Sequence, residues 1–396
     1  MNKPSPRITL PLQSGAFALR TCHSSADGPT AVVAIPAKDE EERIGLCILA
    51  LARQTRPPDA VLLLLNNCSD RTAEVARGLS RRLPYDLYIA KHTFPAPIAN
   101  AGNARRLAMK YAAGLAGRDG ILLTTDADSV VPEDWVANNL AAISAGADLV
   151  CGQVQLDAMG AASIPPHLHA DAAQERELTR LLDEVGRRLD PEAADPWPRH
   201  TEAAGASLAV TVAAFTRAGG IPAIASAEDR AFVSALARMD ARIRHDPAIT
   251  VTVSGRIHGR APGGMADTIR RRIRQRDEFA DQSLEPATDA YRRFDFRRRV
   301  RLAWRDLRAG RTLREELAID IGIPYASFRR MLNNHFFGAT WANVESNSPC
   351  LVRRRVRFTE LPSQIAYVRR LLGQQTDACP VILKQHIRPT HAVNAT

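Results

Sequence analysis

Residues 30–51 of the chain read TAVVAIPAKDEEERIGLCILAL. The apolar and β-branched run 30–35 stops at Pro36, which predicts a short buried strand. Acidic residues at 39–42 then precede an apolar segment with helical periodicity, 44–51, as expected where carboxylates face the positive N-terminal end of a helix. This stretch therefore predicts a strand followed by a helix.

The same alternation of strand and helix continues along the chain. It predicts an α/β fold in which a mostly parallel sheet carries helices on both faces and binds ligands beyond the carboxyl ends of its strands. The next expected strands are 60–65, 86–90 and 120–125, and the helices between them are 70–80 and 100–116. Beyond Asp128 the pattern is looser, and the expected elements are strands 147–156, 242–245 and 249–253, helices 171–190 and 226–239, and a strand and helix across 206–218.

Composition and charge divide the chain of 396 residues into parts. With 45% hydrophobic and 24% charged residues, the chain has the balance expected of a soluble globular protein. Residues 1–260 hold 28 Lys and Arg against 29 Asp and Glu, whereas residues 261–396 hold 25 against 14, a net charge of +11. We expect a flexible leader over 1–28, an α/β domain over 29–260 and a basic, Arg-rich helical region over 261–396.

The localised positive charge suggests an anionic partner, namely nucleotide phosphates, an anionic membrane surface or nucleic acid. A solvated Arg-rich helical face is an equal alternative. The longest apolar run, Ala60–Leu65, has six residues against the roughly 20 that a membrane-spanning helix needs. Polar residues scattered through the first 25 residues argue against a secretory signal. We therefore expect a cytoplasmic protein, with room for peripheral contact with the inner face of the membrane.

The clearest chemical motif is Asp126-Ala127-Asp128, at the end of the expected strand 120–125. Residues i and i+2 of a strand point to the same side, so both carboxylates can face one cation. Carboxylate oxygens suit Mg²⁺ or Mn²⁺ and leave room for phosphate oxygens. A bare D-x-D is more often a solvated turn, but the buried strand before it and residues 130–135 after it favour a metal-diphosphate site.

With its D-x-D followed by Pro132 and Trp135, the chain resembles the family 2 glycosyltransferases of the GT-A fold. The resemblance covers about residues 30–275. It implies a GT-A, Rossmann-like sheet in a nucleotide-sugar-binding and catalytic domain. It also implies transfer of a hexosyl unit from a nucleotide-diphosphate sugar to a hydroxyl acceptor, dependent on Mn²⁺ or Mg²⁺. Inversion at the anomeric carbon is the expected course, and retention is the alternative.

Three segments before the D-x-D resemble donor-binding segments of this family. Residues 36–40 resemble its opening loop, whose acidic residues contact the nucleotide base and ribose. Residues 66–72 resemble its D/N-x-S-x-D-x-T segment, and residues 100–105 resemble its glycine-rich helix start. The donor-binding residues implied by the resemblance are Pro36, Asp39, Glu40, Asn67, Asp70, Gly102, Arg105, Asp126 and Arg256.

A second carboxylate pair, Glu228 and Asp229, stands at the start of an expected amphipathic helix. Asp229 follows the D-x-D by 101 residues, and this spacing resembles that of the family's general base. Such a base takes the proton of the acceptor hydroxyl as it attacks the sugar. Glu228 either caps the helix or faces the acceptor. Residues 205–207 resemble a small-residue loop near the acceptor, so the implied acceptor-side residues are Gly205, Ser207 and Glu228.

Downstream, residues 256–260 read RIHGR after an expected strand end. The resemblance implies that His258 completes the metal site with Asp126 and Asp128, whereas a lone histidine is otherwise more often an ordinary surface or core residue. Arg256 and Arg260 become candidates for contact with the diphosphate. The Q-x-x-R-W signature of processive polysaccharide synthases is absent, which disfavours a polymerising enzyme.

Two other classes of function remain as alternatives. Within residues 314–333, a small residue, a turn glycine and two apolar residues have the spacing of a helix-turn-helix, which would suit a DNA-binding regulator. The basic residues are spread from Arg270 to Arg357 rather than gathered on that helix, which disfavours DNA. A nucleotidyltransferase on a similar sheet normally carries a glycine-rich G-x-G-T-R loop after its first strand, and this loop is missing.

Overall fold

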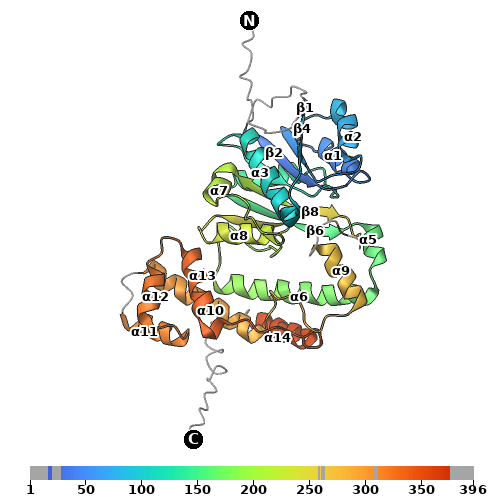
Figure 1. The fold of residues 1–396 in the computed structure, drawn as a ribbon. Coiled ribbons are helices and arrows are strands. Elements are labelled where there is room, and N and C mark those ends of the chain that lie inside the picture. The colour runs from blue at the N-terminus through green and yellow to red at the C-terminus, as the bar shows by residue number, and fades with distance from the viewer. Residues whose placement is uncertain (1–16, 20–27, 257–258, 260–263, 307–310, 375–396) are drawn as a thin grey trace.

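The computed structural model describes residues 17–19, 28–256, 259, 264–306 and 311–374. Within these ranges, a sheet of eight strands forms the centre of the N-terminal half (Figure 1). The strands lie in the order β1-β4-β3-β2-β5-β7-β6-β8. Their bounds are β1 (Phe17–Leu19), β2 (Ala31–Ala37), β3 (Ala60–Asn66), β4 (Asp86–His92), β5 (Ile121–Thr124), β6 (Leu149–Leu156), β7 (Leu208–Thr211) and β8 (Ile243–Val253).

Most neighbouring strands run parallel. Strand β2 pairs in parallel with β3 and β5, β3 with β4, and β6 with β8. Among the described strands, β1 at the edge and β7 inside the sheet run antiparallel to their neighbours. The mostly parallel sheet expected from the sequence is confirmed, and the carboxyl ends of β2, β3 and β5 lie side by side.

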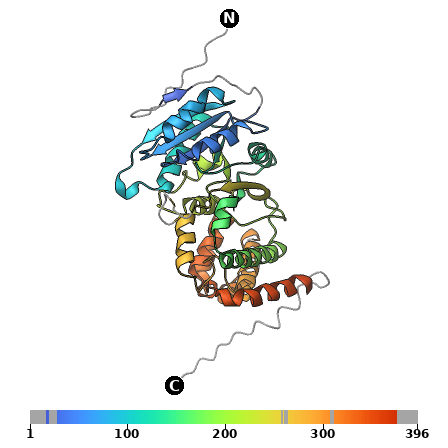
Figure 2. The ribbon, with the colours of Figure 1, turned by 90° about the vertical axis from the view of Figure 1, so that its right-hand side faces the viewer.

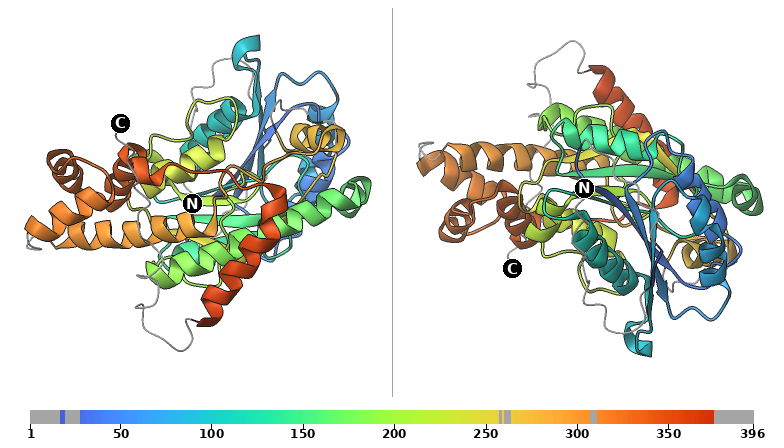
Figure 3. Two further views of the ribbon diagram at one scale, coloured as in Figure 1. Left: turned by 90° about the horizontal axis from the view of Figure 1, so that it is seen from below. Right: turned by 90° about the horizontal axis from the view of Figure 1, so that it is seen from above.

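Helices cover both faces of this sheet. Val33 and Ile35 of β2 face one core, and Val32 and Ala34 face the other, because successive residues of a strand point to opposite sides. Seen from above, α3 lies on one side of the blue strands and α1 and α2 on the other (Figure 3). The helices of this half are α1 (Ile44–Ala52), α2 (Thr72–Leu79), α3 (Ala101–Ala116), α4 (Trp135–Ser144), α5 (Ala158–Ser163), α6 (Pro166–Leu189), α7 (Val212–Arg217) and α8 (Glu228–Ala237).

The prediction of two separate strands at 242–245 and 249–253 is wrong. The segments 242–245 and 249–253 fall in or next to the single strand β8, which pairs with β6 over 243–245 and again over 250–253. A register shift between Cys151 and Gln153 accommodates the residues around Pro247. Proline interrupts the alternating pattern that marks a strand in sequence, but a sheet absorbs such an interruption as a bulge.

The C-terminal region is helical, as expected, and lies below the sheet in Figure 1 and Figure 2. Helix α6 crosses between the two halves. Its buried residues Leu178, Leu181, Leu182 and Val185 pack against α10 and α14. The domain boundary near 260 stays a prediction. Helix α6 precedes this position in sequence but packs on α10 and α14, which follow it. The C-terminal helices are α9 (Met265–Arg274), α10 (Ala287–Arg305), α11 (Arg311–Asp320), α12 (Tyr325–Leu332), α13 (Phe337–Asn347) and α14 (Leu361–Gln374).

Many arginines of this region form ion pairs within the protein. Arg293 of α10 is buried and bonds to Glu285 and Glu345. The expected helix pair is also present as α11 and α12, with Ala318 and Phe328 buried and Gly322 in the left-handed conformation at φ +69°. These helices share a core with α10 and α13. Across the described helices, none combines the length and apolar character that crossing a membrane requires.

Candidate active site

Two aspartates follow strand β5, where its carboxyl end meets those of β2 and β3. The Asp126 carboxylate accepts a 2.5 Å hydrogen bond from Arg105, and its side chain is 38% exposed. Asp128 is more buried, and its Oδ2 lies 3.2 Å from the Nη2 of Arg256. Burial, followed by repulsion from Asp126, raises the pKa of Asp128 to about 6, although Arg256 opposes the rise. The Asp128 carboxyl is therefore protonated more readily than an exposed aspartate.

Arg105 of α3 joins the elements around the site. It is buried, and its Nε donates to Glu228 at 3.0 Å. Its Nη1 donates to the Thr124 hydroxyl and to the Gly205 carbonyl, both at 2.8 Å. With the bond to Asp126, four of its five N–H groups serve protein acceptors. Contact between Arg105 and a donor stays a prediction, and the described bonds assign the side chain chiefly to holding the site together.

The buried Glu40 and the partly exposed Arg256 form a second ion pair beside Asp128. Both Nη atoms of Arg256 donate to the Glu40 carboxylate, at 2.8 and 2.5 Å. Glu40 follows β2 and Arg256 follows β8, so this fork joins strands far apart in the sheet. Fork-shaped pairing of a guanidinium with a carboxylate fixes the geometry of both groups. Arg256 is consequently oriented by Glu40 while it also touches Asp128.

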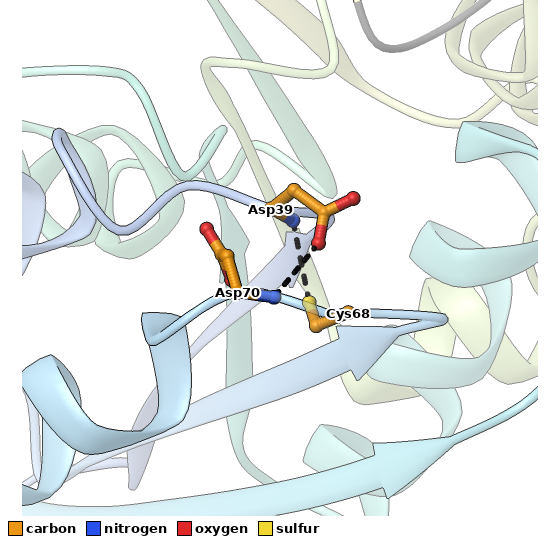
Figure 4. Close-up of side chains that lie close together, drawn as sticks. All are labelled: Asp39, Cys68 and Asp70. Carbon is orange, nitrogen blue, oxygen red and sulfur yellow. Dashed lines mark hydrogen bonds between the residues drawn. The ribbon is translucent and has the colours of Figure 1, made fainter.

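The loops after β2 and β3 are bound to each other by acidic side chains (Figure 4). The Asp39 carboxylate accepts hydrogen bonds from the backbone N–H groups of Ser69 and Asp70, at 2.7 and 3.3 Å. The Asp39 N–H points to the sulfur of Cys68 at 3.4 Å. Asp70 in turn accepts a bond from the Glu41 N–H at 2.9 Å. Both predicted donor-binding aspartates therefore shape these loops, and Cys68 lies between them.

Asn67 and Gly102 have structural roles that their sequence motifs do not reveal. Asn67 has φ +49°, and its side-chain amide exchanges two 2.9 Å hydrogen bonds with the backbone of Phe94. A Cβ on Gly102 would lie 2.2 Å from the carbonyl oxygen of Ile224, so only glycine allows this close approach. Pro36 lies in β2 opposite Leu64 of β3.

Asp229 lies in the first turn of α8, next to the loop that carries Gly205. Its Oδ2 accepts a 2.8 Å hydrogen bond from the Gly205 N–H, and its Oδ1 accepts one from the Arg230 N–H at 2.7 Å. Glu228 is the first residue of this helix, and its side chain pairs with Arg105. A Cβ on Gly205 would come within 2.6 Å of the Arg105 guanidinium. Glycine is therefore needed where this loop meets the arginine.

Ser207, which the sequence predicts on the acceptor side, has its hydroxyl turned into the core. Its hydroxyl is fully buried and accepts a 3.0 Å hydrogen bond from the indole of Trp135. The hydroxyl thus belongs to the core beneath the sheet. Sequence reasoning also missed Cys47 of α1, whose thiol donates to the Asp126 carbonyl at 3.4 Å. Burial raises the pKa of Cys47, so it is a neutral thiol, and no motif marks it.

Comparison with known proteins identifies the region that contains these residues. The family model for glycosyl transferase family 2 matches residues 32–198. These residues form a family 2 glycosyltransferase domain. The expected enzyme class, a glycosyltransferase, is confirmed, and the match includes the D-x-D of Asp126 and Asp128.

Two solved structures resemble the glycosyltransferase distantly. TarS of S. aureus in complex with UDP-GlcNAc is 14% identical with a TM-score of 0.44, over 88% of this chain and 91% of that chain. The mannosyltransferase PcManGT from Pyrobaculum calidifontis, in complex with GDP-Man and Mn²⁺, is 17% identical with a TM-score of 0.44, over 81% and 87%. No curated protein matches the glycosyltransferase.

Two predicted contacts of the glycosyltransferase, His258 and Arg260, lie outside the described residues. The structure brings together the carboxylates of Asp126, Asp128 and Glu40 with Arg105 and Arg256. Through Arg105, this group connects to Glu228 and Gly205 on the other side of the site.

Proposed function

We propose that this glycosyltransferase moves a hexosyl unit from a nucleotide-diphosphate sugar to a hydroxyl acceptor, with Mn²⁺ or Mg²⁺ at the D-x-D motif. The charge balance around this motif carries the proposal. Among the described residues, two guanidinium groups, Arg105 and Arg256, are joined by ion pairs to four carboxylates around the motif, which gathers negative charge there. A divalent cation at Asp126 and Asp128 offsets part of that negative charge. The four carboxylates are Glu40, Asp126, Asp128 and Glu228.

The donor set also fits such a cation chemically. Carboxylate oxygens are the ligands that Mg²⁺ and Mn²⁺ prefer, and Asp126 and Asp128 offer them at the strand ends where α/β sheets bind ligands. His258 is the proposed third ligand. When bound, the cation neutralises negative charge on the leaving diphosphate. Asp39, Glu40, Asp70 and the loops they fix are proposed to receive the nucleoside.

Asp229 is the proposed general base for an inverting transfer. Each of its oxygens accepts one backbone N–H, which leaves lone pairs for the proton of an acceptor hydroxyl. The Gly205 N–H orients the carboxylate, so the base is held in place before the acceptor arrives. The residues serve different substrates: Asp128 faces the donor diphosphate and Asp229 faces the acceptor.

The amphipathic helix α9 supports peripheral contact with an anionic membrane. None of its residues is buried, and Met265, Ile269 and Ile273 stand four residues apart on one face. Met265 is 47% and Ile273 37% exposed, and neither belongs to a core cluster of the described residues. Four arginines occupy the same helix, and three of them form ion pairs with Asp267, Asp277 and Glu175. Apolar and basic residues on one exposed helix are typical of helices that lie on anionic lipid. Sedimentation with phosphatidylglycerol vesicles tests this contact, which Ile273→Glu should weaken.

Calorimetry tests the proposed donor site. UDP, GDP and dTDP are titrated into the protein with Mn²⁺ and then with EDTA. We expect one nucleotide to bind at least tenfold more tightly with Mn²⁺, and Asp128→Ala to abolish this difference. Asp134→Ala, an exposed aspartate at the start of α4, is the matched control. Equal metal-dependent affinity of Asp128→Ala and wild type would refute the site.

A further inference from the structure

The position of Arg256 suggests a role beyond contact with a diphosphate. Its guanidinium is forked onto Glu40, with both Nη atoms bonded to that carboxylate. The same Nη2 that donates to Glu40 also lies 3.2 Å from Asp128 Oδ2. Glu40 is buried at 5% exposure, which makes it a fixed anchor, whereas the Arg256 side chain is 24% exposed. Arg256 therefore sits on a carboxylate that the D-x-D motif would offer to a cation.

A guanidinium and a divalent cation compete for the negative charge of this carboxylate. Arginine does not lose its charge in proteins, so it cannot yield by deprotonation. Two cations within about 4 Å of one another repel strongly in a partly buried site. A divalent cation that binds Asp128 therefore weakens the contact of this carboxylate with the Arg256 Nη2 and favours its movement away. The fork onto Glu40 can keep the rest of the guanidinium nearby.

We infer that Arg256 holds the cation position on Asp128 in the free enzyme and turns to the diphosphate of the donor when a divalent cation takes its place. This inference rests on the proposed function. The freed N–H suits a phosphate oxygen, because a guanidinium fork matches phosphate geometry. A cavity of about 280 Å³, whose lining includes Arg256, Arg43, Asp157, Gly255 and Ser163, offers room beside the side chain, and Arg43 pairs with the one acidic residue of this lining. Metal and donor consequently favour each other's binding through one arginine.

Two binding affinities, which we expect to change in opposite directions when Arg256 is replaced, test the inference. Binding of Mn²⁺ without nucleotide is measured by electron paramagnetic resonance of the free ion, and binding of the nucleotide at saturating Mn²⁺ by calorimetry. Arg256→Gln should bind Mn²⁺ alone roughly fivefold more tightly than wild type, at the lower end of usual couplings between sites. The same variant should bind the nucleotide at least roughly fivefold more weakly.

Arg43→Gln is the matched control. Arg43 lines the same cavity and acts on Asp128 through its charge, but its ion pair is with Asp157 at 3.1 Å. It reports the general effect of removing one positive charge, and we expect its Mn²⁺ affinity to change less than twofold. Arg256→Lys is a second variant, and its single ammonium cannot keep the fork and reach Asp128 together. It should also bind Mn²⁺ alone more tightly than wild type.

The outcomes separate this inference from the proposed function. If wild type binds nucleotide with Mn²⁺ but Arg256→Gln binds Mn²⁺ alone no more tightly than Arg43→Gln does, the inference is overturned and the proposed metal site stands. If wild type shows no binding of Mn²⁺ with or without nucleotide, the metal site itself falls, and the inference with it. Thermal unfolding of each variant establishes that it is folded.

Discussion

The Nε of Arg105 donates a 3.0 Å hydrogen bond to the buried carboxylate of Glu228, although 123 residues separate them in sequence. The bond joins α3 to the first turn of α8. The same guanidinium holds Asp126 of the D-x-D motif and the carbonyl of Gly205. One side chain therefore fixes the D-x-D motif, the loop at Gly205 and the start of α8 relative to one another.

Arg105→Gln should unfold more easily than wild type. It leaves Glu228 as a buried charge without its partner, and breaking a buried ion pair in this way costs about 3–5 kcal/mol. Urea denaturation measures the loss. Arg180→Gln is the control, because Arg180 is 47% exposed and its surface pairs with Glu177 and Glu184 contribute about 1 kcal/mol or less. Equal losses in both variants would contradict the structural role of Arg105.

Asp229→Asn should lose transfer and keep donor binding. Loss of a positioned general base commonly lowers kcat by about 10²- to 10⁴-fold, while donor affinity should stay within a few fold. Asparagine retains an oxygen that can accept the Gly205 N–H, so the loop should keep its position. Steady-state kinetics and nucleotide calorimetry together give the answer. Wild-type activity in Asp229→Asn would remove this residue from the mechanism.

Asp128→Asn should stabilise the metal-free protein at neutral pH. Burial and the charge of Asp126 raise the pKa of Asp128 from 3.8 to about 6, so the folded state binds this proton more tightly than the unfolded chain. The free energy of unfolding of the wild type therefore falls as the pH rises from about 4 to 6. The asparagine variant has no carboxyl at this position, so its stability does not fall for this reason. We expect a gain of about 1–3 kcal/mol at pH 7 and almost none at pH 4, by urea denaturation in EDTA. A gain of the same size at both pH values would count against this origin.

Gly102→Ala should be destabilising, because its Cβ would lie 2.2 Å from the Ile224 carbonyl oxygen. Such overpacking typically costs about 1–3 kcal/mol. Gly78→Ala is the matched control, since Gly78 lies inside α2 with nothing within 4 Å of a Cβ. There the substitution should stabilise by about 0.4–1 kcal/mol through the unfolded state. Similar melting temperatures for the two variants would show that the loop around Ile224 moves aside freely.

Most of the sheet was predictable because its signals are local. Strands such as 31–37 and 60–66 are continuous apolar runs, and short acidic or glycine-containing stretches mark the helices between them. The D-x-D was predictable for the same reason, as a motif at the end of one such run. Strand 243–253 was not, because Pro247 breaks the pattern that a bulge in the sheet tolerates.

The contacts of the site side chains required the fold. Nothing near Arg105 in sequence points to Glu228 or Gly205, which reach it only through the packing of α3 and α8. Ser207 belongs to a motif that the sequence places near the acceptor, yet the bend before β7 turns its hydroxyl toward Trp135. Cys47 carried no signal at all, because a buried thiol on an apolar helix face looks like any small hydrophobic residue.

The packing of α6 also has a consequence for the order of folding during synthesis. This helix leaves the ribosome well before α10 and α14, which cover its buried face of Leu178, Leu181, Leu182 and Val185. The sheet can close around β8 while that face is still open to water. A nascent chain at this stage exposes this apolar helix face, which chaperones can bind and through which chains can aggregate. Expression of a fragment ending near residue 260 would make this transient state permanent.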